Sequence, residues 1–388
     1  MWRQIVFVCL IIQAVAGTCR LDFKSKAPGV FTRKFGSNNI ILSAADGEIS
    51  WDDNMIVNAH CRNGFTDYSY YTSTPEKDLI LSCSGSTVYY KTSEYDATNQ
   101  VRSGYMSCQT ESTYYEATIS ACKEYGLAYG LFVGKQPVIL ADVCYNLNTM
   151  RTQFVHYVAG PRSPVVEIQS TFNPSNATVG SNVSVNAFFD SEAIENENNS
   201  LVKAVQDKMP FYSEIVQYQL QELVPLDKSA GILSPYTKDF INTNTIAWWK
   251  PLKFGNWKSV EEAIAQVSAS SSFDVFAGTS GVVMYPLDKR CSFTEKLTYR
   301  ADQYQRNVPL YVWNYVKSRD DKTDKGVVII GVNSPFFESG NKPDIPCEDI
   351  CDSISWLSSV NNVRKMSSLG YVFCCKPGTI KLENFPDL

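Results

Sequence analysis

Histidine is scarce in this sequence, and so are long apolar segments. Its 388 residues include two histidines, His60 and His156. Since imidazole is the side chain that most readily exchanges protons near neutral pH, only these two positions could supply a histidine base. The apolar run from Ile5 to Val15 is shorter than the ~20 residues that a membrane-spanning helix needs. No later segment is long and apolar enough, so a helix that crosses a membrane is not expected.

The first residues have the pattern of a secretory signal peptide. Arg3 precedes the apolar run, and the small residues Ala14 and Ala16 lie just before Gly17. A positive residue, a short apolar stretch and small residues at the cleavage site are the three parts of such a peptide. The sequence therefore predicts a signal peptide over residues 1–16 and an exported, soluble protein.

Cysteine is abundant by comparison, with twelve residues. Cys9 belongs to the predicted signal peptide, so eleven remain, and export predicts disulfides with one thiol free or paired between chains. Adjacent cysteines rarely bridge each other, so Cys374 and Cys375 should have different partners. A zinc site is the less favoured alternative for four of them, Cys347, Cys351, Cys374 and Cys375.

Three acceptor motifs for N-linked glycans fall within one polar segment. They begin at Asn176, Asn182 and Asn198. A glycan is bulky and needs a surface position, and the segment is rich in asparagine and acidic residues. The sequence predicts a long, glycan-bearing surface loop over residues 172–200.

The chain is longer than the ~250 to 300 residues at which single cores usually stop growing, so two units are expected. Short β-type runs separated by turn residues predict a small, β-rich, disulfide-tied module over 17–130. From 131 to 388 the pattern predicts an α+β body that ends in a cysteine-rich tail. Its expected helices are 200–209, 212–224 and 256–268, and its expected strands are 136–146, 152–160, 273–285, 308–318 and 325–337.

A basic and aromatic segment interrupts this acidic protein. Between Trp248 and Lys258 there are three tryptophans, three lysines and no acidic residue, although the formal net charge of the chain is −5. Residues 228–325 contain fourteen basic and ten acidic side chains. A local excess of lysine beside aromatic residues favours contact with a nucleic-acid backbone.

Five sequence blocks in the second part occur in a characteristic order. They are FDVFAGTSGV, VPLYVWNYV, GVVIIGVNSPFF, PCEDICDSISWL and GYVFCC, and ADVCYNLNT-x-RTQFVHYV precedes them. In this order they resemble the insect branch of the secreted DNA/RNA non-specific endonucleases, over most of residues 131–375. The resemblance implies a ββα-metal fold, in which an Arg-Gly-His motif on a strand leads to a helix that carries a metal-binding Asn. Its implied chemistry is a histidine base that activates water and a Mg²⁺ ion that stabilises charge on the phosphate.

The working residues of that family are not matched here. Its Arg-Gly-His falls on Ala230, Gly231 and Ile232, and an isoleucine cannot accept a proton. Its metal-binding Asn falls on Lys253, whose ammonium has no acceptor for Mg²⁺. Glu261 keeps an acidic position of the family. The resemblance thus implies a degenerate catalytic centre, and neither histidine can replace the lost base by its position in the sequence.

Loss of catalysis leaves binding as the expected function, with the phosphate backbone of DNA and RNA as the partner and no metal or other cofactor. Lys253 is predicted to neutralise a phosphate in the metal's place, and Trp248 or Trp249 to stack on bases. Trp257 and at least one of these two are expected in the core. The full set of predicted contacts is Lys228, Lys238, Asn244, Trp248, Trp249, Lys250, Lys253 and Lys258.

Two alternatives remain at this stage. One is an active metal-dependent nuclease that retains Mg²⁺, and the other is a secreted factor that binds proteins and acts against haemostasis. Among insect relatives the combination of features looks most like the nuclease-like salivary proteins of tsetse flies. That resemblance implies a saliva protein whose ligand is host nucleic acid.

Overall fold

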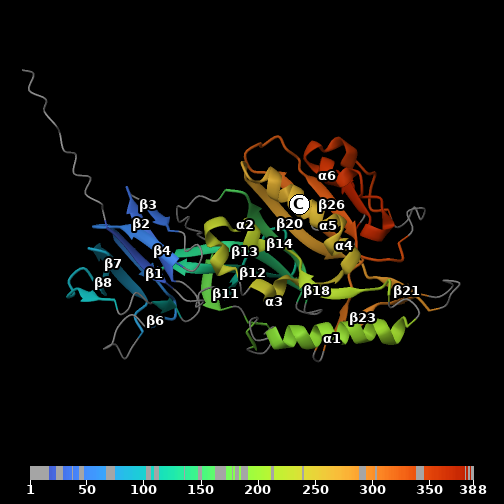
Figure 1. Cartoon of the computed structure of the whole chain (residues 1–388). Helices are drawn as coiled ribbons and strands as arrows, with labels where there is room; N and C mark the ends of the chain where they lie inside the picture. Colours follow the sequence, from blue (N-terminus) through green and yellow to red (C-terminus); the bar gives the residue numbers. More distant parts are fainter. Residues whose placement is uncertain are drawn as a thin grey trace, which may run out of the picture. The chain divides into compact units, whose positions relative to one another are not determined.

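The chain divides into two compact units, residues 1–110 and 111–388, in a computed structural model (Figure 1). The predicted signal peptide lies outside the residues that the structure describes. Among the described helices, none is both long enough and apolar enough to cross a membrane. The described residues are 17–22, 29–36, 38–42, 48–66, 75–101, 106–108, 113–134, 136–146, 151–161, 172–176, 178–179, 183–184, 191–210, 214–237, 240–287, 294–301, 304–337, 345–380, 382 and 385.

The first unit consists of short antiparallel strands. A six-stranded sheet has the order β3–β2–β5–β7–β8–β9, and two further pairs are β1–β4 and β6–β10. The strands are β1 (Thr18–Asp22), β2 (Val30–Phe35), β3 (Asn38–Ile41), β4 (Glu48–Asp52), β5 (Ile56–His60), β6 (Phe65–Thr66), β7 (Asp78–Ser84), β8 (Thr87–Lys91), β9 (Asn99–Gln100) and β10 (Ser107–Cys108).

Alternation of buried and exposed residues explains how these strands form a core. Every second side chain of β7 and β8 is buried, because neighbours along a strand point to opposite faces of a sheet. The disulfide Cys19–Cys83 joins β1 to β7, and Cys61–Cys108 closes the second bridge. This unit is strand-rich and tied by disulfides, as the sequence predicts.

One nine-stranded antiparallel sheet dominates the second unit. Its order is β15–β11–β12–β13–β14–β20–β25–β26–β27. Because β11 and β12 pair into this sheet, the boundary between the units lies before residue 111 rather than near residue 130. The strands are β11 (Thr113–Ala117), β12 (Tyr125–Val133), β13 (Gln136–Asn146), β14 (Arg151–Ala159), β15 (Phe172–Asn176), β20 (Phe273–Ser280), β25 (Tyr311–Ser318), β26 (Val327–Val332) and β27 (Val372–Cys375).

Both faces of this sheet are covered. On one face Phe154, Trp313 and Phe373 belong to a single buried cluster. On the other face lie α4 (Lys250–Phe254) and α5 (Asn256–Val267), seen over β20 and β26 in Figure 1. Gly331 of β26 allows this packing, because a Cβ atom there would lie 2.8 Å from the ring of Trp257.

Two predictions about the middle of the chain are wrong. Residues 191–200, predicted as part of a loop, form the first half of helix α1 (Ser191–Lys208). Leu201 and Val205 are buried in the half that was predicted as a helix, whereas Glu197 is buried in the first half, so no apolar pattern marks that half in the sequence. The predicted helix over 212–224 contains strand β18 (Tyr218–Glu222), which is stabilised by pairing with β19 (Thr245–Trp249).

The glycan motifs are only partly described. Asn176 is the last residue of β15, and Asn182 lies outside the described residues. Asn198 lies in α1, where its side-chain oxygen accepts a hydrogen bond from the backbone N–H of Leu220 at 2.9 Å. Whether any of the three motifs carries a glycan stays a prediction.

Smaller elements complete the second unit. They are β16 (Thr178–Val179), β17 (Val183–Ser184), α2 (Leu226–Ser229), η4 (Gly231–Tyr236), α3 (Ile241–Asn244), β21 (Met284–Pro286), β22 (Thr294–Lys296), β23 (Thr298–Ala301), β24 (Tyr304–Asn307), η7 (Cys351–Ser353), η8 (Ser355–Leu357), α6 (Ser358–Asn361) and η9 (Ser367–Leu369). The unit is therefore mixed in class but rich in strands.

Three disulfides belong to this unit: Cys122–Cys144, Cys347–Cys375 and Cys351–Cys374. The adjacent cysteines at 374 and 375 have different partners, which confirms the prediction and leaves no thiolates there for zinc. With ten cysteines paired, the remaining one after the predicted signal peptide is Cys291, which lies outside the described residues.

Candidate functional site

A strand pair followed by two short helices positions the candidate site. β18 and β19 pair antiparallel, with Glu222 opposite Thr245, and β19 leads directly into α4. Pro251 in the first turn of α4 suits a helix start, because its missing N–H would have no partner there. Gly255 then separates α4 from α5, so the chain changes direction between Lys253 and Glu261.

Asn333 fastens this strand pair to the large sheet. It is fully buried, and its side-chain oxygen accepts from the backbone N–H of Trp249 at 2.6 Å. Its amide nitrogen donates to the carbonyls of Ala247 and Pro309, both at 2.9 Å. Since β19 has β18 on one side only, Asn333 supplies the partners that its other edge would lack. Asn333 thus helps to position β19 and the helix α4 that follows it.

Lys253 lies at the centre of the site. Its Nζ donates to Oε1 of Glu261 at 2.6 Å and to the backbone carbonyl of Glu222 at 3.1 Å. It also lies 4.6 Å from the ring centroid of Trp248, a cation–π distance. The Lys253 and Glu261 side chains are only 11% and 13% exposed. The ammonium is therefore held on three sides, and its charge is largely balanced within the protein.

Further charged groups surround this ion pair. Burial raises the pKa of Glu261, while the positive charges of Lys253 and Lys228 oppose that rise. Burial also raises the pKa of Glu222, and the negative charge of Asp227 adds to the effect. Three carboxylates and two ammonium groups thus act on one another here, so this centre is not a concentration of positive charge. Because Glu261 pairs with Lys253, much of the charge of this ammonium is already balanced, and its contact with a phosphate stays a prediction.

The donors at this centre do not fit the Mg²⁺ ion that the family resemblance implies. Magnesium needs oxygen ligands, whereas the position that the resemblance assigns to the ligand holds the ammonium of Lys253, which pairs with the Glu261 carboxylate. Within the described ranges, side chains of metal-binding type gather in threes at one place, Asp349, Cys351 and Cys374. Those two cysteines bridge each other, which removes their thiolates.

Three of the predicted base-stacking and contact residues are buried in the structure. Trp248 and Trp249 are both buried, and their indole N–H groups donate to the carbonyls of Glu222 and Ile215. Asn244 is 1% exposed, and its side chain makes two hydrogen bonds to the backbone of Val224. These side chains cannot reach a nucleic acid in this structure. Trp257 lies in the core, as expected, with its ring 5.6 Å from that of Trp248.

The residues that match the family's Arg-Gly-His do not lie on a strand. Ala230 is fully buried at the junction of α2 and η4, and the backbone of Gly231 and Ile232 belongs to η4. The side chain of an arginine at position 230 would have no space without local rearrangement. Lys238 lies outside the described residues, and Lys228 is exposed on α2.

An exposed aromatic side chain lies between two of the predicted contact lysines. Phe254, at the end of α4, is 57% exposed and is the one strongly exposed aromatic residue in the described part of the second unit. Lys250 lies one helical turn before it, and Lys258 follows on α5 with its side chain 63% exposed. Phe254 was not predicted, because phenylalanine is usually buried and the stacking role was assigned to a neighbouring tryptophan instead.

Neither histidine takes part in the centre around Lys253. His60 lies in the first unit, where its Nδ1 is 2.7 Å from Asp78. His156 lies in β14 between Asp142 of β13 and Asp274 of β20, at 3.1 Å from each. The next residue, Tyr157, is buried near the charge of Glu261, so His156 points to the opposite face of the sheet. A structural role for His156 agrees with this position.

The pair of aspartates predicts a pH dependence. Burial opposes protonation of His156, but its hydrogen bonds with Asp142 and Asp274 outweigh burial and raise its pKa above 6.5. The protonated imidazole therefore stabilises the fold fully below the ordinary pKa, and this stabilisation is lost as pH rises through the raised value. We expect urea unfolding of wild type to show stability that falls as pH rises above the ordinary histidine pKa of 6.5, and His156→Gln to flatten that dependence.

Asp142→Asn is the matched variant for this test. It removes one of the two carboxylates and should reduce the slope without abolishing it, because Asp274 remains. An equal slope in wild type and His156→Gln would show that other groups govern the pH dependence.

Comparison of the sequence with models of known protein families and with curated proteins found no match.

Proposed function

We propose that this protein is secreted and binds single-stranded nucleic acid without sequence preference and without cleaving it. The observation that supports this most directly is Phe254, 57% exposed and placed between Lys250 and Lys258. Bases of any kind stack on an exposed aromatic ring, and lysines beside it attract the phosphates. Folded proteins usually bury phenylalanine, so an exposed one within residues 250–258, a stretch of the sequence with three lysines and no acidic residue, favours a stacking role.

The arrangement around Lys253 supports the absence of catalysis. A strand pair leads into a helix, an order compatible with a degenerate ββα-metal endonuclease domain, which we propose for residues 131–388. In that proposed domain the ammonium of Lys253 stands where the family has its metal ligand, and it pairs with the carboxylate of Glu261. Ile232 replaces the base, and the described histidines lie elsewhere. Without a proton acceptor or a metal ligand, the two largest contributions to phosphodiester hydrolysis are missing.

The five disulfides support the proposed location. Stable disulfides form in oxidising compartments, and ten of the cysteines are paired in this way. The proposed signal peptide over residues 1–16 and delivery in saliva agree with such a compartment. In an extracellular fluid a protein of this kind would meet nucleic acid released from cells.

Substitution of Phe254 tests the proposal. Phe254→Ala should weaken binding to single-stranded DNA and RNA by roughly 5- to 100-fold, because base stacking contributes ~1 to 3 kcal/mol. Lys250→Ala and Lys258→Ala should each weaken binding to all sequences alike and lower the salt slope by about 0.7. The measurement is filter retention of labelled oligonucleotides at low and raised salt.

The chain offers matched controls for both kinds of change. Tyr95 is 97% exposed in the first unit, so Tyr95→Ala removes an exposed aromatic ring elsewhere. Lys322→Ala removes an exposed lysine away from α4. Both should bind like wild type. No retention of wild type at low salt would refute the proposal, and plasmid cleavage that EDTA suppresses would instead identify an active nuclease.

A further inference from the structure

A second exposed apolar side chain lies on the segment that packs against the helix of Phe254. Met366 immediately precedes η9 and is 48% exposed, although methionine is usually buried in folded proteins. It belongs to residues 363–370, which lie between α6 and β27. Because η9 contacts α4, two exposed apolar side chains lie on neighbouring segments, 250–258 and 363–370.

The two segments approach each other closely at Gly255. A Cβ atom there would lie 2.9 Å from the carbonyl oxygen of Leu369, so a larger residue would not allow this approach. The backbone N–H of Leu369 in turn donates to the carbonyl of Met366 at 3.0 Å. Since Phe254 precedes Gly255 in the chain, one short series of contacts joins Phe254 to Met366.

Asn256 fixes the second segment against the start of α5. It is fully buried, and its side-chain nitrogen donates to the carbonyls of Val363 at 3.0 Å and Gly370 at 2.5 Å. These carbonyls belong to the two ends of the segment that carries Met366. A ligand that contacts both Phe254 and Met366 would therefore not have to order this segment first, which lowers the entropic cost of binding.

Positive charge accompanies the two apolar side chains. The first segment contains three lysines and the second an arginine and a lysine, with no acidic residue in either. Lys253 and Arg364 are paired with carboxylates of the protein itself. Lys365 is exposed, and the pKa of the nearby Asp352 is lowered first by Arg364, at 2.9 Å, and less by Lys365. Lys365 therefore adds to the surface charge that the lysines beside Phe254 provide.

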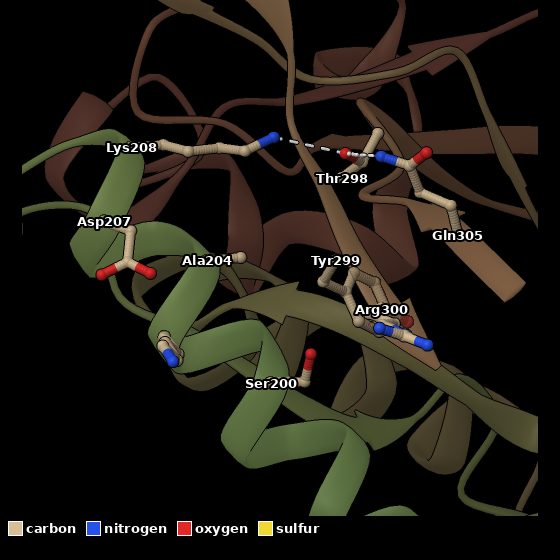
Figure 2. Close-up of a pocket in the computed structure, with 9 residues that line it drawn as sticks. Ser200, Ala204, Asp207, Lys208, Thr298, Tyr299, Arg300 and Gln305 are labelled. Atoms are coloured by element: carbon tan, nitrogen blue, oxygen red, sulfur yellow. Dashed lines mark hydrogen bonds between the residues drawn. The ribbon is translucent and has the colours of Figure 1, made fainter. Parts of the chain in front are cut away.

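The depression between α1 and the β23–β24 hairpin offers a contrast (Figure 2). Lys203 and Lys208 line it, and Lys208 donates to the hydroxyl oxygen of Thr298 at 3.3 Å. The aromatic residue of that lining, Tyr299, is only 5% exposed. Lysines on their own are common on protein surfaces. What distinguishes the surface at Phe254 is that two exposed apolar side chains accompany them.

We infer that a bound single strand continues from Phe254 across η9, and that Met366 packs against a second base. This inference rests on the proposed function and extends the same surface. The lysines select an anionic ligand, and the apolar side chains select one whose rings are exposed. A single strand has both properties, whereas a duplex hides the faces of its bases within the stack.

Methionine suits a contact that does not depend on base identity. Its unbranched side chain adapts to differently shaped partners, and its sulfur makes favourable contacts with aromatic rings. Phe254 and Met366 would then contact different bases of one strand, with phosphates near Lys365. This arrangement agrees with binding that has no sequence preference.

Filter retention of labelled oligonucleotides by the full chain tests the inference. Met366→Ala should weaken retention of single-stranded DNA and RNA by about two- to tenfold, the effect expected for loss of a sulfur–aromatic contact. Lys365→Ala should weaken retention of all sequences alike and lower the salt slope by about 0.7. Because Met366 is exposed, Met366→Ala should keep the unfolding midpoint of wild type.

Matched variants control for the loss of a methionine and of a lysine. Met284 of β21 is 39% exposed, so Met284→Ala removes an exposed methionine from another surface. Lys203→Ala removes an exposed lysine from the depression beside α1. Both variants should retain oligonucleotides like wild type. Cross-linking with an oligonucleotide that contains 4-thiouridine should in addition label residues within 363–370.

The outcomes separate this inference from the proposed function. If Phe254→Ala weakens retention but Met366→Ala and Lys365→Ala bind like wild type, the inference is wrong and the proposed function stands. If wild type is not retained even at low salt, both are wrong. A dimer in gel filtration that Met366→Ala dissociates, with retention unchanged, would instead assign the apolar pair to a contact between copies of the chain.

Discussion

Replacing Lys253 with alanine is expected to lower the free energy of unfolding of the second unit by about 3 to 5 kcal/mol. The substitution leaves the Glu261 carboxylate, 13% exposed, without its ammonium partner. It also removes the donor to the Glu222 carbonyl and the cation over the Trp248 ring. Urea denaturation at neutral pH, followed by the fluorescence of the buried tryptophans, measures the loss.

The same helix provides the control for this prediction. Lys258 and Glu262 form an ion pair at 3.9 Å, but their side chains are 63% and 60% exposed. Lys258→Ala should change stability by less than about 1 kcal/mol, because water screens an exposed pair. The Lys253→Ala deficit should shrink as pH falls through the raised pKa of Glu261, since a neutral carboxyl needs no partner. A deficit below about 1 kcal/mol, or one that does not change with pH, would contradict the account.

Asn333→Ala is the second change for which a large effect is expected. It leaves the N–H of Trp249 and the carbonyls of Ala247 and Pro309 buried without their side-chain partner. Each such group loses ~1 to 3 kcal/mol, so a loss of about 3 kcal/mol or more is expected. Loosening of β19 should also disturb α4, and with it Phe254. We therefore expect weaker oligonucleotide retention even at temperatures where the variant is still folded.

Asn146 is the comparison residue. Its amide donates an exposed hydrogen bond to Glu124 at 3.0 Å, so Asn146→Ala should lower stability by less than about 1 kcal/mol. Urea unfolding of both variants compares the loss of the buried hydrogen bonds of Asn333 with the loss of the exposed hydrogen bond of Asn146. Equal small losses would show that water replaces Asn333 without penalty.

Most strands could be predicted from the sequence because alternation and turn residues act locally. The hairpin of β13 and β14 and the runs that became β20, β25 and β26 were all expected. Strand β18 was not, because Tyr218–Glu222 has helix-compatible residues and becomes a strand only through its pairing with β19. The first half of α1 was not predicted either, because its Asn and Glu residues give no apolar periodicity.

The candidate site was harder to predict because exposure is a property of the fold. The sequence drew the candidate site to residues 248–258, but not to the side chains there that face water. Trp248 or Trp249 was expected to stack on bases, yet both are buried, and the exposed ring is Phe254. The pairing of Lys253 with Glu261, eight residues later, depends on the turn at Gly255. The sequence gives the number of charged residues, but which of them form ion pairs depends on the fold.

The two neighbouring disulfides of β27 have a consequence for association between copies of the chain. β27 is the last strand of the nine-stranded sheet, and adjacent residues of a strand point to opposite faces. Cys375 therefore anchors it from one face through Cys347, and Cys374 from the other through Cys351. While both bonds are intact, β27 cannot separate from residues 347–351, and it can leave the sheet only together with them. In an oxidising fluid any exchange of this edge between molecules would therefore have to move the whole C-terminal segment, whereas a reducing environment would let the strand move alone.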